Sequence, residues 1–174
     1  LPWAGLVASG VVLNKDGSFQ RTARFRGPDL DSATQGEMIA TTARLNNALR
    51  RLGSGWALVI EAERQPAADY PQSDFPEALS WLVDEERRAA FEDAGQHFES
   101  NYHLTLQYLP PEESHARAAR MLYENAPGEG VDWRGRLDAF VAETDRVFDL
   151  LDGVMPAIAW LDDGQTLTYL HATI

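Results

Sequence analysis

Two imidazoles and a carboxylate lie within seven residues, at His97, Glu99 and His103. This donor set can bind Zn²⁺ in sites where a metal-bound water performs hydrolysis. The pattern upstream places His97 and Glu99 in the last turn of a helix, whereas the following alternation places His103 on a strand. Because no H-E-x-x-H motif brings these side chains together, we expect an exposed polar corner. A metal-dependent hydrolase that uses the three residues is the alternative.

The single lysine of the chain, Lys15, precedes Asp16 in a predicted turn. The phosphate-binding loop G-x-x-x-x-G-K-[ST] needs a lysine that reaches the terminal phosphates, so this sequence contains no such loop. The run G-S-G at residues 53–55 lacks the dinucleotide-loop pattern and the nucleophile-elbow spacing. Zero cysteines exclude disulfides, thiolate metal sites and cysteine nucleophiles. We therefore predict no catalytic, cofactor-binding or metal-ligating residue in this sequence.

Two arginines, Arg24 and Arg26, share one face of a predicted strand. They could contact DNA or an acidic partner. Their other role is structural, because Glu61 and Glu63 share a face of another strand and opposite charges across a sheet stabilise it. The chain holds 27 acidic and 15 basic side chains, a formal net charge of −12, whereas phosphate backbones are bound by clustered Lys and Arg. We expect no direct binding of nucleic acid, and a DNA-contacting module is the second alternative.

Residues 65–76 contain three prolines and are predicted to form a loop. Its aromatic residues, Tyr70 and Phe75, belong to no periodic apolar stripe. Exposed aromatic side chains on loops often anchor protein contacts, and folding back onto the core is the other possibility. We predict Tyr70 and Phe75, together with Arg24 and Arg26, as candidate partner contacts.

Apolar periodicity predicts the elements that position these residues. Alternation predicts strands at residues 7–14, 18–26, 56–64, 101–109 and 154–161. Helical spacing predicts helices at residues 34–52, 77–100, 110–124 and 132–152, and another that begins near residue 165. Ser32 or Thr34 can cap the first helix, and Thr34 would form a capping box with Glu37. The apolar stripe of the first helix, which includes Met38, is expected to be buried. In the second helix Leu79, Leu82, Val83 and Phe91 are expected to share one side.

The element order predicts an α+β fold with a single, mostly antiparallel sheet and helices packed on one face. If the helix at 77–100 is set aside as an insertion, the second strand onward reads β-α-β-β-α-β, the order of ferredoxin-like folds. No linker-like stretch divides the chain, so residues 1–174 are expected to form one domain. The sequence begins with Leu1 rather than Met, and it ends at Ile174 inside an apolar pattern. Both observations indicate a fragment of a longer protein.

Several segments are similar to the amino-terminal region of the CagE/TrbE/VirB family of ATPases, which serve conjugation and type IV secretion. The longest are G-V-V-L-N-K-D-G-S-F-Q-R-T at residues 10–22 and R-F-R-G-P-D-L-D at 24–31. Shorter ones are P-W at 2–3, R-L-N-N-A-L at 44–49, G-S-G-W-A at 53–57, H-F-E-S at 97–100, L-P-P at 109–111 and W-L-D-D at 160–163. The resemblance covers nearly the whole chain.

The resemblance implies a non-catalytic docking domain. In that family the motor, with its Walker motifs, lies carboxy-terminal to a region like this one, so ATP and Mg²⁺ would bind beyond Ile174. The domain would attach the motor to the inner-membrane part of the channel from the cytoplasmic face. The implied partners are other inner-membrane subunits and ATPases of the secretion machine, with homo-oligomers formed through the full-length protein. No apolar run approaches the roughly 18 residues of a spanning helix, so the implied association is peripheral.

Overall fold

The computed structural model describes residues 1–67, 69–95, 97–110 and 132–173. Within these ranges one sheet contains the strands β1 (Trp3–Ala8), β2 (Val11–Asn14), β3 (Phe19–Arg26), β4 (Trp56–Pro66), β5 (Phe98–Tyr108) and β6 (Ala157–Trp160). The helices of the same ranges are α1 (Gln35–Leu49), α2 (Ala78–Asp93), α4 (Trp133–Asp152) and α5 (Asp163–Ala172). Apart from its first residue, the helix predicted at 110–124 lies outside the described residues.

The chain divides into two compact units. Unit 1 comprises Leu1–Glu61 and Tyr102–Ile174, and unit 2 is the segment Ala62–Asn101 between them. The strands β4 and β5 each contribute residues to both units, and unit 2 contains α2 and the loop that precedes it. Because unit 2 is inserted between two paired strands, no linker-like stretch announces it in the sequence. A single domain over residues 1–174 stays a prediction.

The strand order of the sheet is β1-β2-β3-β5-β4, and β6 also pairs with β3. One edge of β3 pairs with β5 from Phe19 to Phe25, and the other edge is shared between β2 and β6. All four of the registered pairings are antiparallel. β4 is antiparallel to β5, because Leu109 donates to the Gly55 carbonyl at one end of the pair and Ala67 donates to the His97 carbonyl at the other.

These pairings confirm the predicted α+β fold and its mostly antiparallel sheet. β3, α1, β4, β5, α4 and β6 follow one another along the chain, while their strands lie in the order β4-β5-β3-β6 across the sheet. Each pair of strands joined by a helix is therefore split by one antiparallel strand, which is the ferredoxin-like arrangement. Unit 2 is the insertion in this order, and β1 and β2 extend the sheet beside β3.

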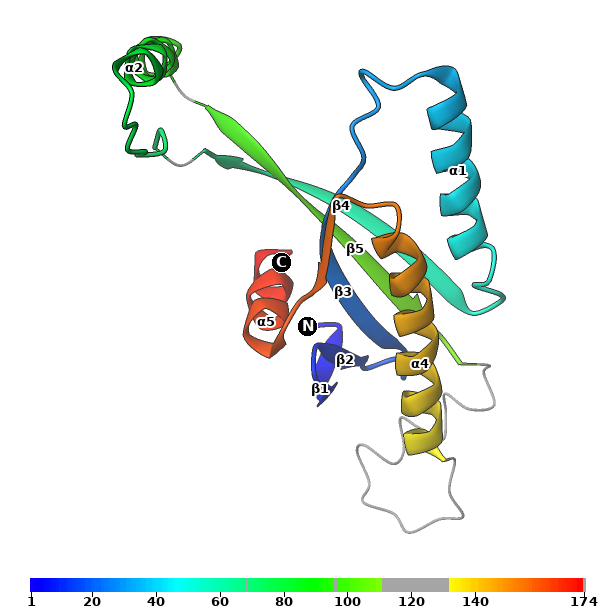
Figure 1. Ribbon diagram of the computed structural model, residues 1–174. Helices are drawn as coiled ribbons and strands as arrows, with labels where there is room; N and C mark the ends of the chain where they lie inside the picture. Colours follow the sequence, from blue (N-terminus) through cyan, green and yellow to red (C-terminus); the bar gives the residue numbers. More distant parts are fainter. Residues whose placement is uncertain (68, 96, 111–131, 174) are drawn as a thin grey trace. The chain divides into compact units, whose positions relative to one another are not determined.

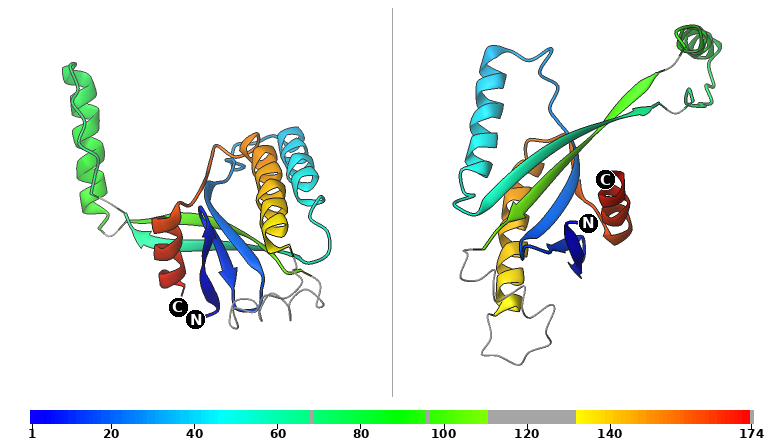
Figure 2. Two further views of the ribbon diagram at one scale, coloured as in Figure 1. Left: turned by 90° about the horizontal axis from the view of Figure 1, so that it is seen from below. Right: turned by 180° about the vertical axis from the view of Figure 1, so that it is seen from behind.

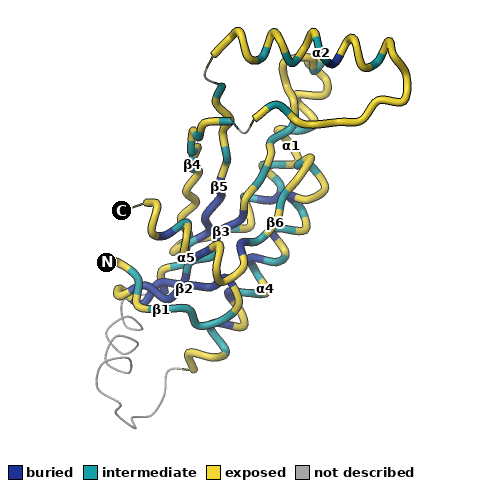
Figure 3. The backbone as a smooth tube through the Cα atoms, turned by 90° about the vertical axis from the view of Figure 1, so that its left-hand side faces the viewer, coloured by how far each residue is buried: buried dark blue, intermediate teal, exposed yellow. Residues whose placement is uncertain are grey.

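The core lies between α4 and the central strands. The buried residues of α4 recur every three or four positions: Leu137, Phe140, Thr144, Val147 and Leu151. The apolar ones pack against Phe19 of β3 and against Leu104 and Leu106 of β5. Figure 3 shows buried residues gathered along these strands and helices of unit 1. Full burial of one such side chain stabilises the fold by about 1.5–3 kcal/mol.

Helices cover both faces of the sheet. As predicted, α1 and α4 lie together on one face, whereas α5 lies on the other (Figures 1 and 2). The face beneath α5 is polar: Thr22 and Thr105 are hydrogen-bonded at 2.9 Å, and Tyr169 of α5 donates to Glu61 at 2.8 Å. Because this strand face is polar, the sequence predicted helices on one face only, and the helix predicted near residue 165 was not placed on the other.

Several boundaries differ from the predicted ones because of glycine. The strand predicted at 7–14 is two strands, since Gly10 adopts a φ of +64° in the turn between β1 and β2. The helix predicted at 77–100 is shorter, because α2 ends at Asp93 and Gly95 follows with a φ of +81°. Thr34 and Glu37 form the predicted capping box of α1. Met38 of α1, expected in the core, is 40% exposed.

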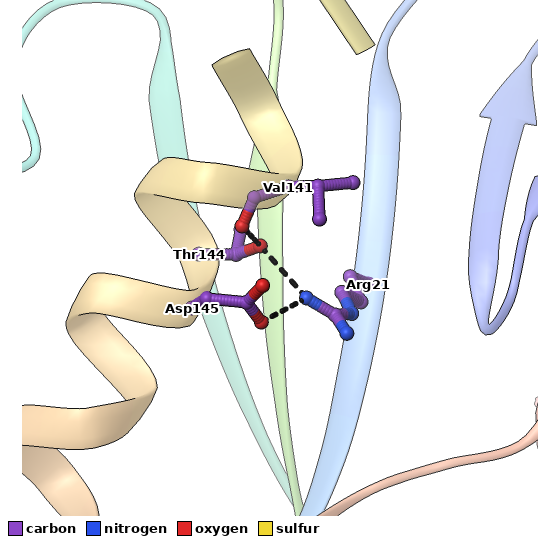
Figure 4. Close-up of polar contacts among 4 residues, drawn as sticks. All are labelled: Arg21, Val141, Thr144 and Asp145. Atoms are coloured by element: carbon purple, nitrogen blue, oxygen red, sulfur yellow. Dashed lines mark hydrogen bonds and ion pairs between the residues drawn. The ribbon is translucent and has the colours of Figure 1, made fainter. Parts of the chain in front are cut away.

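An arginine of β3 fixes α4 on the sheet (Figure 4). Nη1 of Arg21 donates to Asp145 at 2.6 Å and to Thr144 at 3.2 Å, and Thr144 donates to the Val141 carbonyl at 2.9 Å. The guanidinium also lies 4.1 Å from the centre of the Trp160 ring. Since the Arg21 side chain is only 13% exposed, its charge depends on these partners rather than on water.

Replacing the carboxylate partner should therefore weaken the fold. In Asp145→Ala the largely buried Arg21 keeps its charge without its counter-ion, and we expect a loss of about 1–2 kcal/mol in the free energy of unfolding, measured with urea. Glu143→Ala on the same helix is the control, because the Glu143–Arg146 pair is exposed at its arginine and such pairs contribute about 0–1 kcal/mol. Equal losses in the two variants would contradict the role of Arg21.

Candidate docking surface

A small cluster of aromatic and charged residues holds α2 against the preceding loop within unit 2. Tyr70 donates to Asp84 at 2.8 Å, and its ring meets Phe91 edge-on with centroids 5.6 Å apart. The Phe91 ring stacks on His97 at 3.7 Å, and Nε2 of His97 donates to the Phe91 carbonyl. Arg88 lies 3.6 Å from the second oxygen of Asp84. These contacts define the inner face of α2.

The predicted partner contacts in this loop have separate outcomes. Tyr70 folds back onto α2, and the hydrogen bond to Asp84 raises the pKa of the Tyr70 phenol above its ordinary value. Beside Tyr70 lies an open hollow of about 400 Å³, which Arg88 and Phe91 also line. Phe75 is 36% exposed. Contact of Tyr70 and Phe75 with a partner stays a prediction.

The opposite side of α2 is apolar and exposed. Leu79, Leu82 and Val83 are spaced i, i+3, i+4 and are 72%, 51% and 45% exposed. Glu86 and Ala90 continue the same side of the helix and are also exposed. We call these five residues the α2 outer face. In Figure 3 α2 is exposed along nearly its whole length.

The prediction that Phe91 shares a side with Leu79, Leu82 and Val83 is wrong. Phe91 was assigned to the same stripe as Leu79, but it lies on the inner face, where Asp84 is the buried residue of the helix. Helical spacing indicates that an apolar face is covered, yet it does not say whether the cover is the same chain or another protein. Contiguous exposed apolar side chains with a polar rim are typical of interaction sites.

Unit 2, which carries the outer face, is strongly acidic. Unit 2 contains ten acidic and three basic residues, and Glu85, Glu92 and Asp93 accompany Glu86 on α2. Amphipathic helices that lie on membranes carry Lys and Arg on their polar side, so this helix is of the wrong charge for an anionic lipid surface. A protein groove bordered by Lys and Arg would match it.

The structure does not bring together His97, Glu99 and His103. His97 packs on Phe91 in unit 2, whereas His103 is buried in unit 1 with its ring 4.7 Å from that of Tyr169. Glu99 lies on β5 rather than on a helix, and side chains on a strand are spread along it. Within the described ranges, no three His, Cys, Asp or Glu side chains are grouped so that they could hold a metal ion.

Arg24 and Arg26 are exposed on β3, as predicted for partner contacts. The predicted pairing with Glu61 and Glu63 is wrong, because β5 lies between β3 and β4. Glu61 instead accepts from Tyr169. Among the residues that the structure describes, neither arginine forms an ion pair. Contact with a partner through them stays a prediction.

Comparison with known proteins decides the family. A sequence profile described as Type IV secretion system ATPase VirB4/TrbE, N-terminal domain, matches residues 10–116, which include all of unit 2. This chain belongs to the VirB4/TrbE family. The resemblance inferred from the segments at 10–22 and 24–31 is confirmed. Within the described residues, no helix is both long and apolar enough to cross a bilayer.

Two relatives are named as conjugal transfer proteins. The chain is 44% identical over 132 residues to the first portion of a probable conjugal transfer protein TrbE from Sinorhizobium fredii (strain NBRC 101917 / NGR234), a match that covers 74% of this chain and 88% of the relative. It is 38% identical over 159 residues to the conjugal transfer protein TrbE of Rhizobium radiobacter, covering 89% of this chain and 19% of that relative. The chain thus spans about a fifth of the length of the second relative.

The inner face of α2 should depend on the phenol of Tyr70. In Tyr70→Phe the nearly buried carboxylate of Asp84 loses a hydrogen bond, which costs about 1–2 kcal/mol. We expect amide hydrogen exchange in α2 to accelerate by about 5- to 30-fold. Tyr102→Phe is the control, since the Tyr102 ring packs on Phe25 in unit 1. An unchanged exchange rate in Tyr70→Phe would contradict the proposed packing.

The same contact has a defined pH dependence. A raised pKa means that the stabilising contribution of Tyr70 is complete below the unfolded value of about 10 and disappears as pH rises through the folded value. The difference in α2 stability between the wild-type chain and Tyr70→Phe should therefore shrink above about pH 10.

Proposed function

We propose that this chain is a non-catalytic docking domain of a conjugative ATPase, and that it docks through the α2 outer face. Membership of the VirB4/TrbE family supports a place in a type IV secretion machine. The observation that carries the choice of surface is the exposure of Leu79, Leu82 and Val83 on one side of a helix whose other side is occupied.

The proposed partner is another subunit of the secretion machine. It presents an apolar groove that receives the α2 outer face, in the manner of helix-in-groove complexes, where residues at i, i+3 and i+4 supply the anchors. Lys and Arg border this groove, because Glu86 lies on the α2 outer face and unit 2 carries ten acidic against three basic residues. Opposite charges accelerate the encounter and orient the helix, while the apolar contacts hold the complex.

The proposal divides the work of the longer protein between regions. ATP and Mg²⁺ bind in a carboxy-terminal motor, since the present chain supplies no G-x-x-x-x-G-K-[ST] loop and its single lysine lies in the turn between β2 and β3. The docking domain attaches that motor to inner-membrane channel subunits at the cytoplasmic face. Homo-oligomers form through the longer protein.

Acidic substitutions on the outer face should prevent docking without unfolding the domain. We expect the double variant Leu79→Asp, Val83→Asp, introduced into the full-length transfer protein, to lower the conjugal transfer frequency and the co-purification of inner-membrane subunits by at least about tenfold, which equals ~1.4 kcal/mol of binding. Circular dichroism should be unchanged because both side chains are solvent-exposed.

The matched control is Ile39→Asp on α1, which alters an apolar residue of similar exposure, 63%, in unit 1. It should leave transfer frequency and co-purification unchanged. Normal docking by the α2 variant, or equal loss in the control, would exclude the α2 outer face as the docking surface.

The isolated 174-residue chain should not hydrolyse ATP. Phosphate release at the level of a buffer blank is expected with ATP and Mg²⁺, and Lys15→Ala should change nothing because Lys15 lies in a turn. Turnover on the scale of typical enzymes, about 1 s⁻¹ or more, would contradict a non-catalytic domain.

A further inference from the structure

Among the residues that the structure describes, no strand pairs with the outer edge of β4. β4 is the last strand in the order β1-β2-β3-β5-β4. The hydrogen bond from Leu109 to the Gly55 carbonyl fixes its register on β5, in agreement with the Trp56 and Tyr108 rings, whose centroids lie 5.0 Å apart. In an antiparallel pair, alternate residues direct their backbone groups toward the neighbour. The N–H and C=O groups of Leu58 and Ile60 therefore point away from β5.

The side chains along this edge are apolar on both faces of the sheet. Leu58 and Ile60 share the face of Trp56, which packs in the core beneath α4, and are 36% and 62% exposed. Val59 lies on the opposite face and is 48% exposed. Residues 56–60 read W-A-L-V-I, with no proline, glycine or charge. Natural sheets usually protect their edges with proline, charged side chains or bulges.

The other end of the sheet shows such protection. β1 pairs with β2 through two register shifts, which fall between Trp3 and Gly5 and between Leu6 and Ala8. Irregularities of this kind bend an edge and interrupt its row of hydrogen-bonding groups. In an antiparallel ladder without bulges, the two residue numbers of every pair add up to the same value. The pairs Gly55–Leu109 and Ala67–His97 share one value, so β4 keeps a single register on β5. Over residues 56–60 the β4 edge is thus regular and apolar.

We propose that residues 56–61 of β4 bind an extended segment of a partner protein by antiparallel β-strand addition, and that this segment alternates apolar and basic residues. Strand addition satisfies the outward backbone groups and leaves side chains to set specificity. The apolar residues of the added strand lie on the face of Leu58 and Ile60. Its basic residues lie on the opposite face, beside Val59 and the carboxylate of Glu61.

Charge selects a partner over a second copy of this chain. Each copy carries a formal net charge of −12, so pairing two β4 edges brings together two strongly acidic domains, and self-repulsion opposes their association. A basic segment instead gains from the same field. This inference uses unit 1 residues and does not depend on the docking role of α2 in unit 2.

The test uses the 174-residue chain and a synthetic ten-residue peptide that alternates Val and Lys, labelled with fluorescein. We expect fluorescence anisotropy to show saturable binding, and hydrogen exchange at the Leu58 and Ile60 amides to slow when the peptide is added. In the antiparallel register, the peptide residues opposite Leu58 and Ile60 are valines, and their N–H groups face β4. N-methylation of the Val amides should therefore abolish binding, whereas N-methylation of the Lys amides should preserve it.

A variant of the chain provides the matched measurement. Ile60→Pro removes an outward N–H group and leaves the bonds to β5, as proline on an edge strand does, so the affinity should fall at least tenfold. Leu79→Asp, Val83→Asp should bind the peptide normally, which separates this edge from the α2 outer face.

Each contrary result overturns the proposal. Equal binding of the two methylated peptides would show attraction to acidic surface alone, and loss of binding in the α2 variant would place the peptide on unit 2. Unchanged exchange at Leu58 and Ile60 would exclude strand addition even if Ile60→Pro failed to fold. Sedimentation that shows a dimer of the wild-type chain and a monomer of Ile60→Pro would assign the edge to a second copy.

Discussion

The packing of α4 across β3 and β5 is the contact on which the other features depend. It buries the apolar stripe of the longest helix against the two central strands, and Arg21 adds a directional link, since a guanidinium bonds its partners at defined angles. With the centre fixed in this way, β6 can share an edge of β3 with β2, while β4 remains at the far end of the sheet. Neither candidate interaction surface includes any of the buried residues of this packed centre.

The free energies of apolar burial and of association favour attachment through more than one contact. Covering three side chains that are already partly buried contributes on the order of 3–6 kcal/mol, whereas association loses about 4–15 kcal/mol of rotational and translational freedom. The α2 outer face alone therefore supports weak binding. A second contact on the same partner complex would act at high effective concentration and raise the overall affinity without enlarging either surface. The β4 edge is a suitable second contact because it belongs to a different unit.

The sequence predicted the features that arise from local chemistry and from periodicity. Thr34 and Glu37 satisfy helix-end donors within four residues, and the α4 stripe repeats over about four turns, so both were predicted correctly. What failed depended on partners distant in sequence. The pairing of Arg24 with Glu61 required knowledge that β5 lies between their strands, and the side of α2 on which Phe91 lies required knowledge of its contact with Tyr70. Arg21, set between Phe19 and Ala23 on the core face, was the signal for an acidic partner on α4 that sequence reasoning missed.

The insertion of unit 2 between two adjacent antiparallel strands has an evolutionary consequence. The ends of β4 and β5 are already held together by their own ladder, so lengthening the connection between them adds only slowly to the entropy of loop closure. The sheet can therefore keep its order while the inserted segment changes in length or sequence. The docking surface proposed on α2 could therefore diverge among transfer systems without any change in the sheet.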